Sequence, residues 1–187
     1  MYKAVVIGAS AGGFHALRRL LTKLPKKFPI PILIVQHISP TSDNYMTKFL
    51  DKKSDLRVKE ADEKELILGG TVYIAPPNYH LLIEEDYTIS LSTESKKNYS
   101  RPSIDILFES ASYAYGDELI GVVLTGANSD GADGLQSIKE NGGYCIVQEP
   151  KEAESTAMPL AAIERASPHK ILNINSIADL LVTLVKQ

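Results

Sequence analysis

The sequence predicts an α/β fold: a doubly wound, mostly parallel sheet with helices on both faces and an antiparallel hairpin at one edge. Short apolar runs rich in valine and isoleucine recur without polar alternation, which is typical of parallel strands covered on both faces. Segments with helical spacing of apolar residues lie between these runs and indicate strand–helix–strand units. The chain of 187 residues has the length of one domain with a sizeable core. We therefore expect residues 1–187 to form a single domain.

Five apolar runs are predicted to be the strands of the parallel sheet. Most of them are followed at once by small or polar residues, where the chain leaves the sheet. The predicted strands are Ala4–Ile7, Ile32–Gln36, Thr71–Ala75, Leu119–Leu124 and Tyr144–Gln148.

Three segments carry a helical repeat of apolar residues. Phe14–Leu24 is followed by Pro25, which stops a helix, and Ala132–Asn141 is followed by a glycine pair, which is common after a helix end. Ser176–Lys186 places its isoleucine and leucines on one face. A further helix is expected to start near Pro102, because proline is favoured in the first turn.

Two short alternating runs interrupt this order. His80–Glu84 and Thr88–Ser92 flank a charged turn and are predicted to pair as an antiparallel hairpin, placed at the edge of the parallel sheet. The polar stretch Ser92–Ser100 that follows is predicted to be the most mobile loop.

Composition excludes several classes of protein. The net charge is −3 with both signs mixed along the chain, so we expect no nucleic-acid partner. The apolar runs are far shorter than the ~20 residues of a membrane span, and the first of them is too short for a signal peptide, so we expect no membrane insertion and a cytoplasmic location. The lone cysteine, Cys145, lies in a predicted buried strand and is expected to pack in the core. No metal or cofactor is expected.

The corner after the first strand carries the first chemical signal. Gly8 to Gly12 fit the pattern G-x-S-x-G between a strand and a helix, which is the setting of a nucleophile elbow with Ser10 at its tip. A dinucleotide site is the competing interpretation, but the glycine spacing is G-x-x-x-G-G and the second strand ends in Gln36-His37 where an acidic residue is expected. A merely structural turn also remains open.

A serine nucleophile needs a base, and the base needs an acid to orient it. His37 ends the second predicted strand and Asp130 follows the fourth, so both are expected on the same rim as Ser10. Each has a structural alternative: His37 as a polar strand-end residue, and Asp130 as a helix N-cap. His15 is a weaker base candidate, and His80 and His169 are expected at the surface.

The blocks that carry these residues resemble the catalytic domain of the chemotaxis receptor methylesterases, the CheB family. They occur in the family's order over nearly the whole chain: IGASAGG, VQHISP, VYIAPPNYHLLIE, RPSIDILFES, LTGANSDGADGL and AMPLAAIERA. The resemblance implies a serine hydrolase in which Ser10 is the nucleophile, His37 the general base and Asp130 the orienting acid. It implies hydrolysis of glutamate methyl esters on the cytoplasmic helices of chemoreceptors with release of methanol, and for some members deamidation of receptor glutamine.

The same resemblance suggests the residues around these three. The backbone N–H groups of Ala11 and Ala127 are the candidates for the oxyanion donors, and Arg101 and Ser103 for substrate contacts. Two departures from the family pattern fall here, Ala11 for a threonine and Ala127-Asn128 for a Met-Gly pair. Asn128 keeps the second donor in place if its φ is negative or if it adopts the left-handed region that asparagine tolerates.

The N-terminal receiver domain of well-known family members has no counterpart before the first predicted strand. Two interpretations are open: a free-standing esterase, controlled by a separate receiver protein or by nothing, or a fragment of a longer protein. We expect that a phosphoryl donor does not activate this chain. The alternative from another class is a non-catalytic module that keeps the fold and binds receptors. A serine hydrolase of small esters is a third interpretation.

Overall fold

A seven-stranded parallel sheet forms the centre of the protein. The structure is a computed structural model, which describes residues 1–186. The strands lie in the order β3-β4-β2-β1-β7-β8-β9, and every neighbouring pair is parallel. They are β1 (Ala4–Ala9), β2 (Ile32–Gln36), β3 (Arg57–Glu60), β4 (Thr71–Ile74), β7 (Leu119–Val123), β8 (Tyr144–Gln148) and β9 (Lys170–Leu172).

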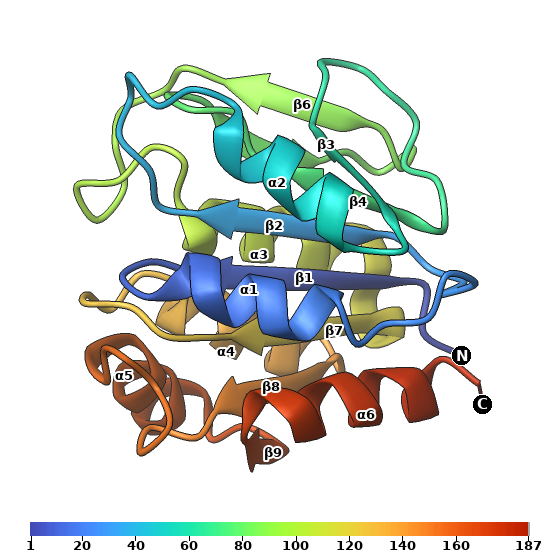
Figure 1. Cartoon of the computed structure of the whole chain (residues 1–187). Coiled ribbons are helices and arrows are strands. Elements are labelled where there is room, and N and C mark those ends of the chain that lie inside the picture. Colours follow the sequence, from blue (N-terminus) through green and yellow to red (C-terminus); the bar gives the residue numbers. More distant parts are fainter. Residues whose placement is uncertain (187) are drawn as a thin grey trace.

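Helices cover both faces of the sheet, as Figure 1 shows. One face carries α1 (Gly13–Leu21), α2 (Tyr45–Lys53) and α6 (Ile174–Leu184), and the other carries α3 (Ile104–Tyr115), α4 (Ala132–Glu140) and α5 (Ala157–Ala166). Each layer encloses its own apolar cluster. All six residues of β1 are buried, as expected for a central strand between two helical layers. The predicted doubly wound parallel fold is therefore confirmed.

The predicted hairpin forms, but the expected place at the sheet edge is wrong. Strands β5 (His80–Ile83) and β6 (Ile89–Ser92) make a separate two-stranded sheet, and the edges of the main sheet are β3 and β9. The reason lies in the contacts of β5 with α3. The Ile83 N–H donates to Ser110 Oγ at 3.1 Å, so the hairpin is tied to the helical layer.

Some elements lie outside the sequence prediction. Strand β3 has one buried residue, Val58, and β9 has three residues, so neither shows an apolar run. Helix α2 buries two of its side chains, Thr47 and Leu50, which leaves little helical periodicity. These elements at or beside the sheet edges do not alter the centre, where β1 lies between β2 and β7.

The carboxyl ends of the strands of the parallel sheet lie at one end of the molecule, to the left in Figure 1, where the arrows of β1 and β2 end. After β1 the chain builds one half of the sheet through β2, and it later returns to build the other half from β7. In such sheets ligands bind outside the carboxyl ends, where the strand order reverses. That place is the end of β1, directly before Ser10.

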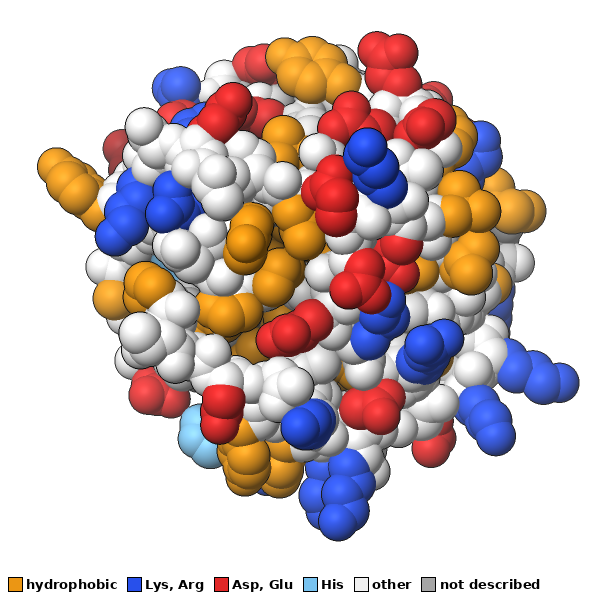
Figure 2. All heavy atoms as spheres, turned by 90° about the horizontal axis from the view of Figure 1, so that it is seen from above, with side chains coloured by type: hydrophobic (Ala, Val, Ile, Leu, Met, Phe, Trp, Pro, Cys, Tyr) orange, Lys and Arg blue, Asp and Glu red, His pale blue; other side chains and the backbone are white. Residues whose placement is uncertain are grey.

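The surface carries charges of both signs. Figure 2 shows, on the side of β6 and α2, acidic and basic side chains intermingled around hydrophobic ones. Within residues 1–186 no helix has the length and apolarity that crossing a membrane requires.

Candidate functional site

Ser10 and His37 follow directly from neighbouring strands in register. Ala9 at the end of β1 pairs with Gln36 at the end of β2, and the His37 N–H donates to the Ala9 carbonyl at 3.0 Å. Ser10 and His37, the residues that follow this pair, therefore leave the sheet side by side. Ser10 is partly exposed, and its hydroxyl makes no hydrogen bond within residues 1–186. The structure thus gives the predicted nucleophile and the predicted base one common rim.

Asp130 reaches the same rim from the loop between β7 and α4. Its Oδ2 lies 2.7 Å from His37 Nε2, and its side chain is fully buried while that of His37 is 12% exposed. An ionised carboxylate only accepts hydrogen bonds, so Nε2 carries the proton of the neutral ring. Nδ1 is then the nitrogen with a free lone pair. The alternative of Asp130 as a side-chain N-cap of α4 is wrong, since Gly131 holds that position and no side-chain cap is formed.

Backbone and side-chain donors surround the Asp130 carboxylate. Besides His37, Oδ2 accepts the Ile104 N–H at 2.7 Å, and Oδ1 accepts the Asp105 N–H at 3.1 Å and Ser103 Oγ at 2.9 Å. Burial alone raises the pKa of Asp130, but the hydrogen bonds from His37 and the backbone outweigh it and hold the pKa below its ordinary value. Asp130 is therefore an anion that stays ionised in a buried site.

A second buried carboxyl, Asp105, stands next to Asp130. Its Oδ1 accepts the N–H groups of Gly131 and Gly134 at 2.9 and 2.7 Å, which joins the start of α3 to the start of α4. Burial raises the pKa of Asp105 to about 6, and the charge of Asp130 adds to the rise. Asn98 bridges the two carboxyls, because Nδ2 donates to Asp105 at 2.8 Å and to Asp130 at 3.1 Å. Asn98 belongs to Ser92–Ser100, the loop predicted to be the most mobile, and its side-chain amide is thus part of the site.

The two predicted substrate residues lie differently from the expectation. Ser103 is fully buried and donates to Asp130, so its position does not support a substrate contact. Arg101 is partly exposed, but its guanidinium donates to the carbonyls of Thr93 and Glu94 and to Asn78 Oδ1. These bonds anchor the loop before α3 and occupy most of the donors of Arg101.

The predicted oxyanion donors lie on two adjoining corners. Ser10 N–H donates to the Thr125 carbonyl at 2.9 Å, and Thr125 Oγ1 donates to the Ala11 carbonyl at 2.8 Å, so the corner after β1 is joined to the loop after β7. Ala11 and Ala127 are both exposed, and within residues 1–186 neither N–H donates to a protein acceptor. Both N–H groups are therefore available to a ligand.

Asn128 does not need the left-handed backbone. It is absent from the residues with positive φ in the described part of the chain, so the first of the two conditions on it is met. Its Oδ1 accepts the Asp130 N–H at 3.1 Å, a short-range turn that polar side chains favour. Asn128 therefore supports the loop that carries Asp130.

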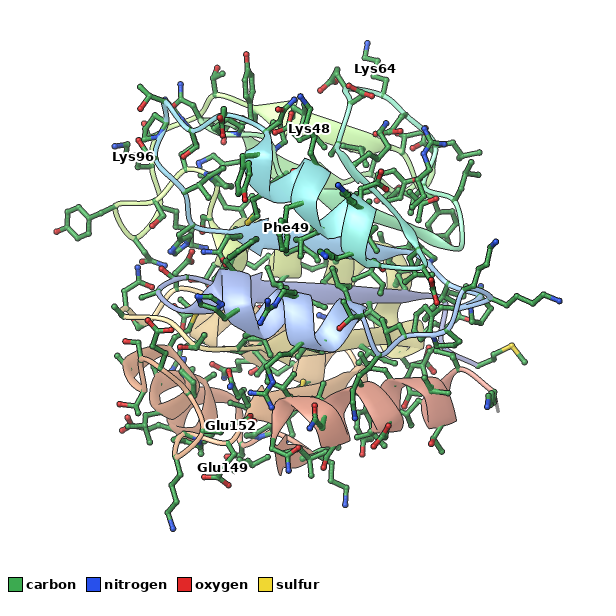
Figure 3. All side chains as sticks on the ribbon, in the orientation of Figure 1. Lys48, Phe49, Lys64, Lys96, Glu149 and Glu152 are labelled. Atoms are coloured by element: carbon green, nitrogen blue, oxygen red, sulfur yellow. The ribbon has the colours of Figure 1, made fainter. Side chains whose placement is uncertain are left out.

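A small hollow opens beside His37. It measures about 100 Å³ and is lined by residues after β2 and before α3, including Ile38, Tyr99 and Arg101. This is the space of roughly three water molecules. Lys96 also lines the hollow, and Figure 3 shows it at the end of the molecule toward which β2 runs.

Some residues of the site carried no recognisable signal in the sequence. His80 was expected at the surface, and this is wrong: it is fully buried, and Nδ1 accepts the Ser103 N–H at 3.2 Å. Gln36 is buried and donates to the carbonyls of Ser10 and His37. Their partners come from other elements, so no short motif could reveal them.

Cys145 is buried in the core, and burial raises the pKa of its thiol to about 12, which confirms the packing role. Over residues 1–186, no group of three or more His, Cys, Asp or Glu side chains is placed to hold a metal ion.

Known proteins resemble the chain along almost its full length. A family described as "CheB methylesterase" matches residues 5–181. A relative from Leptospira interrogans (serovar copenhageni), named "Putative protein-glutamate methylesterase/protein-glutamine glutaminase", is 55% identical over 183 residues, which are 98% of this chain and 95% of the relative. A Methanosarcina acetivorans relative, "Protein-glutamate methylesterase/protein-glutamine glutaminase 2", is 40% identical over 188 residues, 97% of this chain and 53% of the relative. The chain spans about half the length of that second protein.

A solved structure has the same fold. The crystal structure of the Thermotoga maritima CheB methylesterase catalytic domain superposes with a TM-score of 0.94 at 35% identity. The match covers 98% of this chain and 99% of that one.

Proposed function

The chain belongs to the CheB methylesterase family, and from that membership we propose that it is a protein-glutamate methylesterase acting through Ser10, His37 and Asp130. The substrates are glutamate methyl esters on the cytoplasmic helices of chemoreceptors, and methanol is the released product. The observation that carries the proposal is the 2.7 Å contact of His37 Nε2 with a buried Asp130, beside a serine whose hydroxyl is not engaged.

The first half of the reaction transfers the glutamyl group to the enzyme. Ser10 Oγ attacks the ester carbonyl carbon while His37 Nδ1 takes the hydroxyl proton, and Asp130 stabilises the imidazolium that results. The negative oxygen is held by the N–H groups of Ala11 and Ala127. When the C–O bond to the methoxy group breaks, His37 returns the proton and methanol leaves.

The second half regenerates the enzyme. Water attacks the acyl carbon as His37 takes one of its protons, and the bond to Ser10 Oγ breaks with return of that proton. A glutamate carboxylate is released. An amide substrate follows the same steps with ammonia as the leaving group, so the same site accounts for glutaminase activity if receptor glutamine reaches it.

The assembled charge pair argues against the non-catalytic alternative. A buried carboxylate whose pKa is lowered by a histidine held against it is typical of a functional site, and this favours the enzyme over a module that only keeps the fold. We place Ser103, Asn98 and Asp105 as positioning residues for Asp130, and Arg101 as the anchor of the loop beside the hollow. We further propose that residues 1–187 form a single domain and that the protein is cytoplasmic.

A fluorophosphonate probe tests the serine assignment without any receptor. We expect it to label Ser10 in the purified protein, and His37→Ala to abolish the labelling because the hydroxyl then lacks its base. Labelling that persists at the same rate in His37→Ala would contradict the proposed mechanism.

A further inference from the structure

One side-chain amide holds the backbones of the nucleophile and the base together. Gln36 is 6% exposed at the end of β2. Its Nε2 donates to the Ser10 carbonyl at 2.9 Å and to the His37 carbonyl at 3.0 Å. Both carbonyls lie just beyond the strand ends, where the sheet no longer supplies all their partners. A planar amide with two donors thus sets the spacing of the two residues.

The same contact fixes the direction of the Ala11 N–H. The Ser10 carbonyl accepts a second hydrogen bond, from the Gly13 N–H at 2.8 Å, so both of its lone pairs are engaged on the protein side. The peptide bond from Ser10 to Ala11 is trans, and in a trans peptide the N–H points opposite to the carbonyl. The Ala11 N–H is therefore turned outward, where within residues 1–186 it finds no acceptor.

The absence of a side chain at Gly13 leaves the space that the Gln36 amide occupies. A Cβ on Gly13 would lie 1.9 Å from Gln36 Oε1, far inside contact distance. Oε1 is buried and has no hydrogen-bond partner within residues 1–186. A buried oxygen without a partner destabilises the fold, and such a group in a native structure calls for an explanation. The explanation here is that Oε1 is left unpaired so that Nε2 can bridge two carbonyls.

We propose that Gln36, seated against Gly13, is a positioning residue for acyl transfer at Ser10. Its amide holds the Ser10 carbonyl inward so that the Ala11 N–H faces the oxygen that becomes negative in the transition state, and it holds the backbone of His37 beside Ser10. This inference rests on the proposed function, and it adds a residue that touches neither the substrate nor the reacting atoms.

The effect of losing the amide should fall on kcat and not on KM. An oxyanion donor acts mainly on the transition state, so its misplacement lowers kcat and kcat/KM equally. Complete loss of one donor costs about 10²–10³ in kcat, and we expect Gln36→Met to lower kcat about 10- to 100-fold with KM changed less than threefold. The readout is methanol released from a methylated receptor fragment.

Gln148→Met is the matched control. Gln148 is also a buried glutamine at the end of a strand, β8, but its amide binds the Thr125 N–H and Glu152 instead of the carbonyls of Ser10 and His37. Because the Thr125 carbonyl accepts the Ser10 N–H, Gln148 acts on the corner only through Thr125, and Gln148→Met should lower kcat less than Gln36→Met does. The proposal is supported if Gln148→Met lowers the melting temperature about as much as Gln36→Met does but lowers kcat less. An equal fall in kcat in both variants, or an unchanged kcat in Gln36→Met, overturns it. If Gln36→Met does not fold, Gln36→Glu, which keeps the side-chain length but replaces the donor, takes its place with the same outcomes.

Gly13→Ala tests the role of Gln36 independently, because it changes the residue against which the amide packs. The added Cβ would meet the Gln36 amide and also the Ala9 Cβ, at 2.8 Å. The substitution should therefore lower kcat in the wild type and lower it less in a Gln36→Ala background, where only the Ala9 contact remains; equal effects in both backgrounds contradict the proposal. The rate of fluorophosphonate labelling at Ser10 is measured for every variant. If the wild type labels but releases no methanol, the proposed function fails, and the labelling rates still decide the role of Gln36.

Discussion

His37 Nε2 lies 2.7 Å from Asp130 Oδ2, and this contact decides which ring nitrogen serves as the base. Since Asp130 is held as an anion, Nε2 carries the proton and Nδ1 is left to receive the proton of Ser10. The register of β1 with β2 puts Ser10 next to His37, and the loop after β7 brings Asp130 to them from the other half of the sheet. The three residues are thus joined by the order of the strands.

Asp130→Asn should remove nearly all activity. The new amide cannot accept from every donor that now surrounds the carboxylate, and it favours the tautomer of His37 that has its proton on Nδ1. In the serine-protease triad the equivalent change costs about 10⁴-fold in kcat, and we expect a loss of that order in methanol release. Asp133→Asn is the control, because Asp133 pairs with Arg165 at the surface, and it should stay within twofold of the wild type. Asp130→Asn activity within tenfold of the wild type would contradict the assignment.

Ser103→Ala separates positioning from substrate binding. Ser103 donates to Asp130 from a fully buried position, so its loss should lower kcat about 3- to 10-fold and leave KM unchanged. A hydrogen bond to a charged group contributes about 1.5–3 kcal/mol, and urea unfolding should show a loss of that order. A raised KM with an intact kcat would instead restore the predicted substrate contact.

Asn128→Gly should not raise the rate. Asn128 has no positive φ to relieve, and its side chain accepts the Asp130 N–H. Glycine removes that bond and adds freedom to the unfolded chain, so we expect kcat/KM to be unchanged or about twofold lower in steady-state methanol release. A rate above the wild type would mean that Asn128 strains the loop after all.

Asp105→Asn should change the pH dependence of stability. The pKa of Asp105 is raised from 3.8 to about 6 in the folded protein. The protonated carboxyl of Asp105 therefore contributes to the free energy of unfolding in full below about pH 3.8, and this contribution is lost as the pH rises through about 6. Asn keeps an acceptor for the N–H groups of Gly131 and Gly134 but does not ionise. We expect the free energy of unfolding of Asp105→Asn, relative to the wild type, to increase between pH 4 and pH 7 in urea titrations. A difference that is constant with pH would contradict a raised pKa.

The sequence predicts the centre of this fold better than its edges, for a physical reason. Apolar runs such as Ile32–Gln36 are long because both of their faces are covered, whereas β3 at an edge has a single buried residue. Ser10, His37 and Asp130 could be proposed because each follows such a run. Gln36 and His80 could not, since their roles depend on partners from other elements: the Ser10 carbonyl for one and the Ser103 N–H for the other.

For Ser103, the sequence suggested a role that its position in the structure does not support. Its block resembles a segment beside the family's active site, and that placement suggests a substrate contact. Whether a hydroxyl in that segment points outward or toward Asp130 depends on how α3 packs against α4, which the pattern of residues does not encode. Burial decided the matter: Ser103 has no exposed surface.

Methanol release from receptor fragments that carry glutamate methyl esters tests the central claim most directly. The wild-type protein should release methanol in proportion to the ester present, and Ser10→Ala should reduce the release by several orders of magnitude while its melting temperature stays close to that of the wild type. Ser10 is partly exposed at a corner, so the loss of its hydroxyl should not disturb the fold. A wild type that binds the fragments and releases no methanol, or a Ser10→Ala protein that releases it at the wild-type rate, would contradict the assignment of this site as a methylesterase.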